Sequence, residues 1–179
     1  MALLEILKYP DAILKKVSLP VKGITAETIR LIADMVETMY AAPGVGLAAP
    51  QVGFLQRIIV LDIDYKEPGK NLLKLINPEI LHADGEVVWE EGCLSVIDFT
   101  AEVKRAERVE VIALDEKENE VKIEAEGLLA VALQHEIDHL DGKLFIDRLS
   151  RLKRDLYTRR LKKALRAGKP QPESARLMI

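Results

Sequence analysis

The chain is poor in cysteine, in aromatic residues and in long apolar stretches. Its single cysteine, Cys93, excludes an internal disulfide and leaves a buried small residue, a nucleophile or a metal ligand. Aromatic residues make up only 4 % of the chain, so the core must be mainly aliphatic. No apolar run is as long as a membrane span, and the segment Met1–Lys8 lacks the layout of a signal peptide. We therefore expect a cytoplasmic protein with no membrane attachment.

Charged residues are plentiful but unevenly distributed. They make up 31 % of the 179 residues, beside 49 % hydrophobic residues, which is typical of one globular domain. The net charge is −3, yet the segment from Arg148 to Lys169 holds ten basic residues against one acidic residue, Asp155. That segment carries +9 and the rest of the chain −12. Such a segment is either a solvated helix or a contact for an anionic partner.

Hydrophobic periodicity predicts two amphipathic helices. The first runs from Thr25, as N-cap, to about Ala41. The last runs from about Ser150 to Ala167 and has a thin apolar stripe formed by Leu152, Leu156, Leu161 and Leu165. Gly168–Pro170 is expected to end it, and Gln171–Ile179 to fray.

Alternating and β-branched residues predict several strands. The predicted ranges are Arg57–Ile63, Leu72–Ile76, Glu86–Glu90, Arg108–Leu114 and Glu120–Glu126. The last two are joined by a polar turn and should pair antiparallel. Asn77-Pro78 is expected to form a turn or a strand edge, and a turn is expected around His82. The whole chain, residues 1–179, should form one α+β domain with antiparallel or mixed sheets around a buried central helix, and residues 150–179 should form a basic helix and tail.

The central helix carries the sequence His135-Glu136-Ile137-Asp138-His139. Positions four apart lie on one face of a helix, so both imidazoles point the same way. Two converging imidazoles can hold a divalent metal, and the carboxylate of Glu136 can carry a proton to or from water. The apolar flanks indicate a buried helix, in which a metal would give both histidines a partner. An ordinary amphipathic helix is the alternative.

Two histidines alone rarely complete a hydrolytic metal site, so a third ligand is required. Cys93 is the leading candidate, because thiolate is a strong ligand for borderline metals. Glu90, Glu91 or a carboxylate after His139 are the competitors.

Three separated motifs together resemble the peptide deformylases, in particular the bacterial type. They are Gly44–Gln51 (GVGLAAPQ), Glu91–Ser95 (EGCLS) and Gln134–His139 (QHEIDH). The third motif alone is a weak signal, but the three in this order and spacing are specific. The resemblance covers the chain from Ile6 to about Leu149.

The resemblance implies a metal held tetrahedrally by Cys93, His135 and His139, with water in the fourth position. The usual metal of the family is Fe²⁺, whereas this ligand set by itself suits Zn²⁺. Zn²⁺, Ni²⁺ or Co²⁺ are expected as alternatives in purified protein. The implied reaction removes the N-formyl group from the formylmethionine of nascent polypeptides and releases formate.

The resemblance also assigns roles to the residues around the metal. Glu136 is the proton carrier, and the Gln51 side-chain amide and the Leu94 backbone N–H donate to the oxyanion. Arg105 is expected to pair with Glu91 in support of the second motif, and a surface arginine is the alternative. A substrate peptide would lie as an added strand near Gly46. The methionine pocket would be formed by Val45, Trp89, Leu128, Val131, Ala132 and His135.

Departures from the family pattern concern the pocket and not the metal ligands. This chain has Ile97 where many members have proline, Thr100 where many have a larger polar residue, and the bulky Trp89. They leave the sequence preference beyond formylmethionine open. In some members the C-terminal helix docks on the ribosome, and the basic helix here suggests the same contact. A monomer is expected.

Two rival hypotheses belong to other classes. One is an HExxH endopeptidase with a carboxylate or histidine as third ligand. The other is a non-catalytic ribosome- or RNA-binding module with a structural zinc, for which His82 is the one spare histidine.

Overall fold

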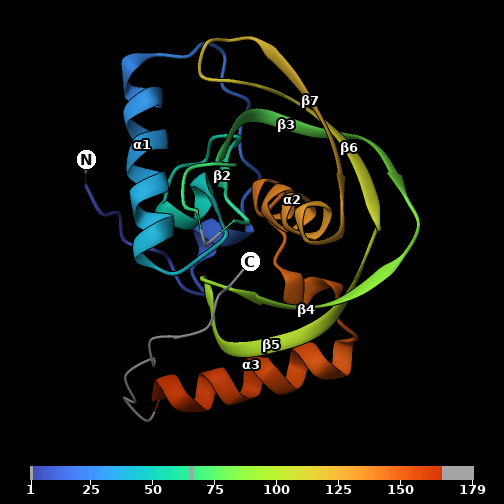
Figure 1. Cartoon of the computed structure of the whole chain (residues 1–179). Coiled ribbons are helices and arrows are strands. Elements are labelled where there is room, and N and C mark those ends of the chain that lie inside the picture. The colour runs from blue at the N-terminus through green and yellow to red at the C-terminus, as the bar shows by residue number, and fades with distance from the viewer. Residues whose placement is uncertain (1, 65–66, 167–179) are drawn as a thin grey trace.

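The computed structural model describes residues 2–64 and 67–166, whose helices and sheets are arranged around a central helix (Figure 1). The α-helices are α1 (Ala26–Ala41), α2 (Gly127–Leu140) and α3 (Arg151–Arg166). The strands are β1 (Gly46–Ala48), β2 (Ile58–Leu61), β3 (Leu73–Asp84), β4 (Val87–Cys93), β5 (Val96–Arg105), β6 (Arg108–Leu114) and β7 (Glu120–Glu126). Short 3-10 helices are η1 (Ala12–Lys15), η2 (Ala49–Val52) and η3 (Phe145–Arg148).

The strands form two antiparallel sheets. The larger has the order β1-β2-β3-β6-β7, and β4 pairs with β5 as a separate hairpin. In Figure 1, α2 lies in the middle, with β3, β6 and β7 curving over one side and the β4–β5 hairpin across the other. Helix α1 lies beside β1 and β2, and α3 lies along the outer side of β5. The predicted α+β class with antiparallel sheets is confirmed.

The core is centred on α2, which lies between the two sheets and is buried on all sides over most of its length. Every residue from Ala130 to Leu140 is buried. Its aliphatic side chains pack with those of β2 and β6, for example Leu133 with the cluster that contains Ile59 and Val111. The predicted aliphatic core is therefore present, and the two metal-site histidines of the sequence hypothesis lie within it.

Local sequence signals account well for α1 and for the β6–β7 pair. Thr25 caps α1, and its hydroxyl accepts a hydrogen bond from the backbone N–H of Thr28, as expected for an N-cap. Strands β6 and β7 have the predicted bounds and are joined by a turn in which Asp115 accepts bonds from backbone N–H groups. These elements were predictable because their patterns depend on neighbours close in sequence.

The turn predicted around His82 is wrong, and Asn77-Pro78 forms no turn, because β3 runs through both positions. The ladder to β6 shifts register between Ile76 and Glu79, and Asn77 has a positive φ of 52°. The Asn77 side chain also donates to the carbonyl of Val21 and accepts from its N–H, both at 2.8 Å. A β-bulge therefore absorbs the proline without ending the strand.

The structure differs from the sequence prediction at the β4–β5 hairpin and at α3. Strand β5 has no counterpart among the predicted strands. On α3, Leu152 and Leu156 are 70 % and 52 % exposed, while Tyr157 is buried and stacks on Phe99 with centroids 4.5 Å apart. The inner face of α3 is thus formed by Tyr157 together with Leu161, the one leucine of the predicted stripe that is partly buried among the described side chains. The side chain of Leu165, the stop at Gly168–Pro170 and the tail Gln171–Ile179 lie outside the described residues.

Among the described helices, none combines the length and the apolar character that a membrane span needs.

Candidate metal centre and active site

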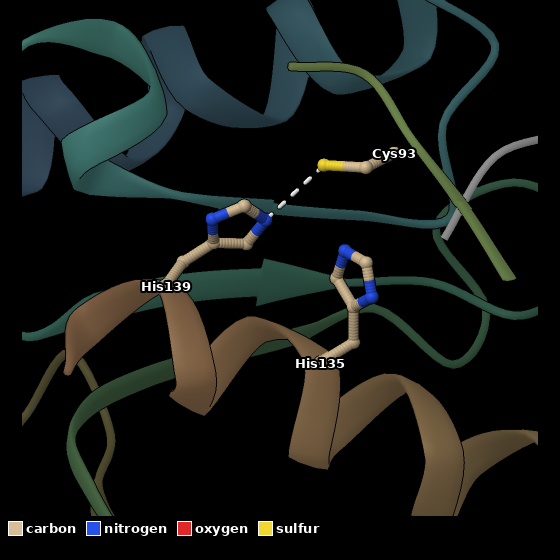
Figure 2. A group of neighbouring side chains, drawn as sticks. All are labelled: Cys93, His135 and His139. Carbon is tan, nitrogen blue, oxygen red and sulfur yellow. Dashed lines mark hydrogen bonds between the residues drawn. The ribbon is translucent and has the colours of Figure 1, made fainter. Parts of the chain in front are cut away.

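Three potential metal ligands from two elements meet in the core. Cys93 ends β4, and His135 and His139 lie one helical turn apart on α2. Their ligand atoms all lie within 4.8 Å of one another, and each residue is 1 % exposed. Figure 2 shows both imidazoles on the side of α2 that faces Cys93, with the Cys93 Sγ 3.3 Å from His139 Nε2. No other such group occurs among residues 2–64 and 67–166.

The hydrogen bonds of the two imidazoles fit a divalent ion between them. Nδ1 of His135 donates to Oε2 of Glu91 at 2.8 Å, so its Nε2 is the atom left to bind a metal. That Nε2 is buried and has no partner among the described residues. Burial, followed by the nearby His135, lowers the pKa of His139 well below its ordinary value, which keeps it neutral as a ligand must be. These donors suit a borderline metal such as Zn²⁺ or Fe²⁺.

The thiol of Cys93 needs a cation to ionise in this setting. Burial raises its pKa above the ordinary range, although the Ser95 backbone N–H donates to its sulfur at 3.4 Å. A metal would supply the charge that stabilises the thiolate. The competing ligands are otherwise engaged: exposed Glu90 accepts from Thr100, and Asp141 pairs with Arg57.

Glu136 lies in the core with an unpaired carboxyl group. It is 0 % exposed, and neither of its oxygens has a hydrogen-bond partner among the described residues. Burial, and then the charge of Glu91, raises its pKa well above the ordinary value. A Cβ at Gly46 would come within 2.4 Å of Glu136 Oε1. Only glycine leaves room for this carboxyl group, so β1 and α2 meet at the candidate active site.

Gln51 is oriented by the backbone beside it. Its Oε1 accepts from the Ala48 N–H at 2.8 Å, which turns its Nε2 toward Cys93 Sγ at 3.6 Å and Ser95 Oγ at 3.2 Å. Leu94 follows Cys93 directly, and its carbonyl accepts from Lys8 Nζ at 2.6 Å. An amide N–H donor and the Leu94 backbone therefore both flank the thiol.

Glu91 is held by Arg105 as well as by His135. Arg105 Nε donates to Glu91 Oε1 at 2.7 Å and Nη2 to Oε2 at 2.8 Å, and both side chains are 0 % exposed. Burial would raise the pKa of Glu91, but the bonds from Arg105 and His135 outweigh it and lower the pKa. Glu91 is thus an ionised carboxylate with both oxygens in use, which excludes it as the third ligand.

The residues expected around a methionine side chain lie together. Val45, Val131 and Ala132 are buried in one cluster, and Trp89 and Leu128 pack against it. His82 is not part of this site: it is exposed on β3 and lines a separate surface pocket with Arg108 and Glu110.

Four residues near the site were missed by the reasoning from sequence. They are Lys8, Ser95, Asp138 and Arg148. Ser95 ends the second motif, and Lys8 lies in the segment where the family resemblance begins, but neither residue had a role assigned to it. Asp138 lies between the two histidines, where a polar residue in an enclosed helix is itself a signal. Arg148 gave no signal among so many basic residues.

Comparison with known proteins identifies close relatives along nearly the whole chain. The family model described as polypeptide deformylase matches residues 3–155. A peptide deformylase of Thermodesulfovibrio yellowstonii is 55 % identical over 162 residues, covering 90 % of this chain and 98 % of that one. One of Syntrophobacter fumaroxidans is 51 % identical over 93 % of this chain and 98 % of its own.

Solved structures give the same result. The crystal structure of a peptide deformylase from Legionella pneumophila has a TM-score of 0.87 and 47 % identity, covering 96 % of this chain and 100 % of that chain. That of Ehrlichia chaffeensis in complex with actinonin has a TM-score of 0.85 and 40 % identity, covering 93 % and 99 %. These matches speak against the two rival hypotheses, an endopeptidase and a non-catalytic binding module.

Proposed function

Because the chain belongs to the peptide deformylase family, we propose that Cys93, His135 and His139 hold the metal of this hydrolase. The enzyme removes the N-formyl group from nascent polypeptides. The observation that carries the assignment is the meeting of one thiol and two imidazoles beside the unpaired carboxyl of Glu136. Water adds to the formyl carbon, the C–N bond breaks, and formate and a free amine leave.

The chain's own residues would divide the chemistry among them. When bound, the metal lowers the pKa of water so that hydroxide forms near neutral pH. Glu136 accepts the proton of the attacking water and later delivers it to the leaving amine. The side-chain amide of Gln51 and the backbone N–H of Leu94 donate to the oxyanion that develops on the formyl oxygen. The bond from Ala48 to Gln51 Oε1 supports this role, because it presets the direction of the donor.

Substrate binding would use an apolar pocket and a sheet edge. The methionine side chain would enter among Val45, Trp89, Leu128, Val131 and Ala132, next to His135. The peptide backbone would lie along β1 near Gly46, since β1 is the edge strand of its sheet. Glu91 and Arg105 would support the site by orienting His135.

Fe²⁺ is the metal proposed for the native enzyme, on the strength of the family resemblance. We expect the Fe²⁺-loaded protein to hydrolyse formyl-Met-Ala-Ser faster than the Zn²⁺-loaded protein when both are assayed without oxygen. On exposure to air, the Fe²⁺ form should lose activity and the Zn²⁺ form should keep it. Equal anaerobic rates at equal occupancy would count against iron. No formate release from any fully loaded form would count against the assigned reaction.

A contact between α3 and the ribosome is the proposed partner interaction. Its charges are well presented, because Arg159, Arg160, Lys162 and Lys163 are all exposed. Replacing these four with glutamine should weaken cosedimentation with ribosomes, most clearly at low salt. Hydrolysis of short peptides should be unchanged. Truncation is less suitable, because it would also remove buried Tyr157.

The matched control removes four exposed lysines outside α3. They are Lys16, Lys22, Lys122 and Lys143. Since both variants lose the same charge, equal loss of cosedimentation in the two would contradict a specific contact of α3.

The enzyme is also proposed to be a monomer that acts in the cytoplasm, where polypeptide chains are synthesised.

A further inference from the structure

A buried network of ion pairs joins the two elements that supply the metal ligands. Arg105 on β5 holds Glu91 with two hydrogen bonds, and its remaining Nη1 donates to Asp138 Oδ2 at 2.5 Å. Glu91 lies two residues before Cys93 on β4, and Asp138 lies directly before His139 on α2. Arg105 therefore connects the strand that carries the thiol with the helix that carries both imidazoles.

This network continues to the surface through Arg148. Arg148 Nε donates to Asp138 Oδ2 at 2.5 Å and Nη2 to Oδ1 at 2.7 Å. The Arg148 side chain is 40 % exposed, whereas those of Asp138 and Arg105 are 7 % and 0 % exposed. Arg148 is the last residue of η3 and is separated from the start of α3 by Leu149 and Ser150. One end of the network is thus a surface residue, and the other is Nδ1 of His135.

The charges balance only when Arg148 is included. Glu91 and Asp138 are two anions, and Arg105 and Arg148 are two cations. Without Arg148, Asp138 would compete with Glu91 for the single guanidinium of Arg105 in a region with little water. Buried ion pairs are sensitive to the loss of one partner, because the charge left behind is poorly solvated. Arg105 would then hold Glu91 less firmly, and Glu91 would orient His135 less firmly.

We propose that Asp138 and Arg148 are positioning residues for the metal site. Through Arg148, the metal affinity would depend on the position of the segment that joins η3 to α3. This inference rests on the proposed metal ligands and adds a function for two residues outside them. Partners that orient metal-bound histidines typically change metal affinity by about 10–100-fold when removed. Arg148 acts on His135 through three intervening residues, Asp138, Arg105 and Glu91, so the lower end of that range, about 10-fold, is expected.

The test compares Arg148→Gln with a matched control, Arg151→Gln. Arg151 is three residues away, its side chain is 90 % exposed, and it lies 3.7 Å from Asp155 without reaching the network. Both variants lose one positive charge from the same part of the chain. Zn²⁺ affinity is measured on the full chain by competition with a chromophoric chelator. The absorption spectrum of the Co²⁺-loaded protein reports ligand geometry, and thermal unfolding of the metal-free protein reports folding.

We expect Arg148→Gln to weaken Zn²⁺ binding about 10-fold and to shift the Co²⁺ spectrum, while Arg151→Gln changes the affinity by less than about 2-fold. Arg148→Lys, which keeps one charged donor, should recover much of the affinity. It also serves if the glutamine variant fails to fold. Equal Zn²⁺ affinity and spectra for Arg148→Gln, Arg148→Lys and wild type would overturn the inference. Absence of Zn²⁺ and Co²⁺ binding by the wild type would overturn the proposed metal site as well.

Discussion

Replacing Glu136 with glutamine is expected to lower kcat by about 10²–10⁴-fold, the usual contribution of a positioned proton carrier. Glutamine has nearly the same shape, so it should fit against Gly46 and leave the metal bound. It cannot accept a proton from water at neutral pH. The measurement is formate release from formyl-Met-Ala-Ser at saturating substrate, with metal content determined on the same sample.

A control on β7 separates this effect from a general loss of charge. Glu124 is exposed, and Glu124→Gln removes the same charge without touching the core. We expect it to retain wild-type turnover. Glu136→Gln should not unfold more easily than the wild type in the metal-free state, because it replaces a buried carboxyl group, which has no partner among the described residues, with a polar group of nearly the same shape. Wild-type turnover by Glu136→Gln at full metal occupancy would show that another group carries the proton.

Replacing Gln51 with alanine is expected to lower kcat by about 10²–10³-fold, as loss of one oxyanion donor typically does. The effect should fall on kcat more than on KM, because the donor acts on charge that develops after binding. Alanine also removes the acceptor for the Ala48 N–H. A second variant, Gln51→Glu, keeps that acceptor and lacks the amide donor.

Both Gln51 variants should therefore be slow, although only Gln51→Glu keeps the acceptor for the Ala48 N–H. Gln56→Ala provides the matched control, since Gln56 is partly buried in the same connection but lies outside the site. Wild-type kcat in Gln51→Glu with the metal retained would leave the Leu94 N–H as the sole candidate donor.

The metal-site candidates could be predicted as far as local geometry reaches. The i, i+4 spacing of His135 and His139 places both on one face of a helix, wherever that helix lies in the fold. The third ligand could not be chosen from spacing, because Glu90, Glu91 and Cys93 lie next to one another in the sequence and are about equally far from the two histidines. What separates them is nonlocal: Arg105 engages Glu91 from the neighbouring strand, and Thr100 engages Glu90.

The fold shows the same division between local and distant causes. Strands β6 and β7 were predictable because their alternation and turn lie within about twenty residues of sequence. The continuation of β3 past Pro78 depends on Asn77 bonding to Val21, which is 56 residues away. Likewise, α3 packs on the fold mainly through Tyr157, with Leu161 beside it, because Phe99 of β5 offers Tyr157 an aromatic surface. Neither contact can be predicted from the residues next to it in the sequence.

The scarcity of aromatic residues has a spectroscopic consequence. Trp89 is the one tryptophan in the chain, so the tryptophan fluorescence of the protein comes from a single ring. That ring is partly buried on β4, four residues before Cys93, where it packs against the cluster containing Val131 and Ala132. Its emission is thus a built-in probe of the proposed methionine pocket. Ligand entry and metal loading can be followed in the unmodified enzyme, without a label.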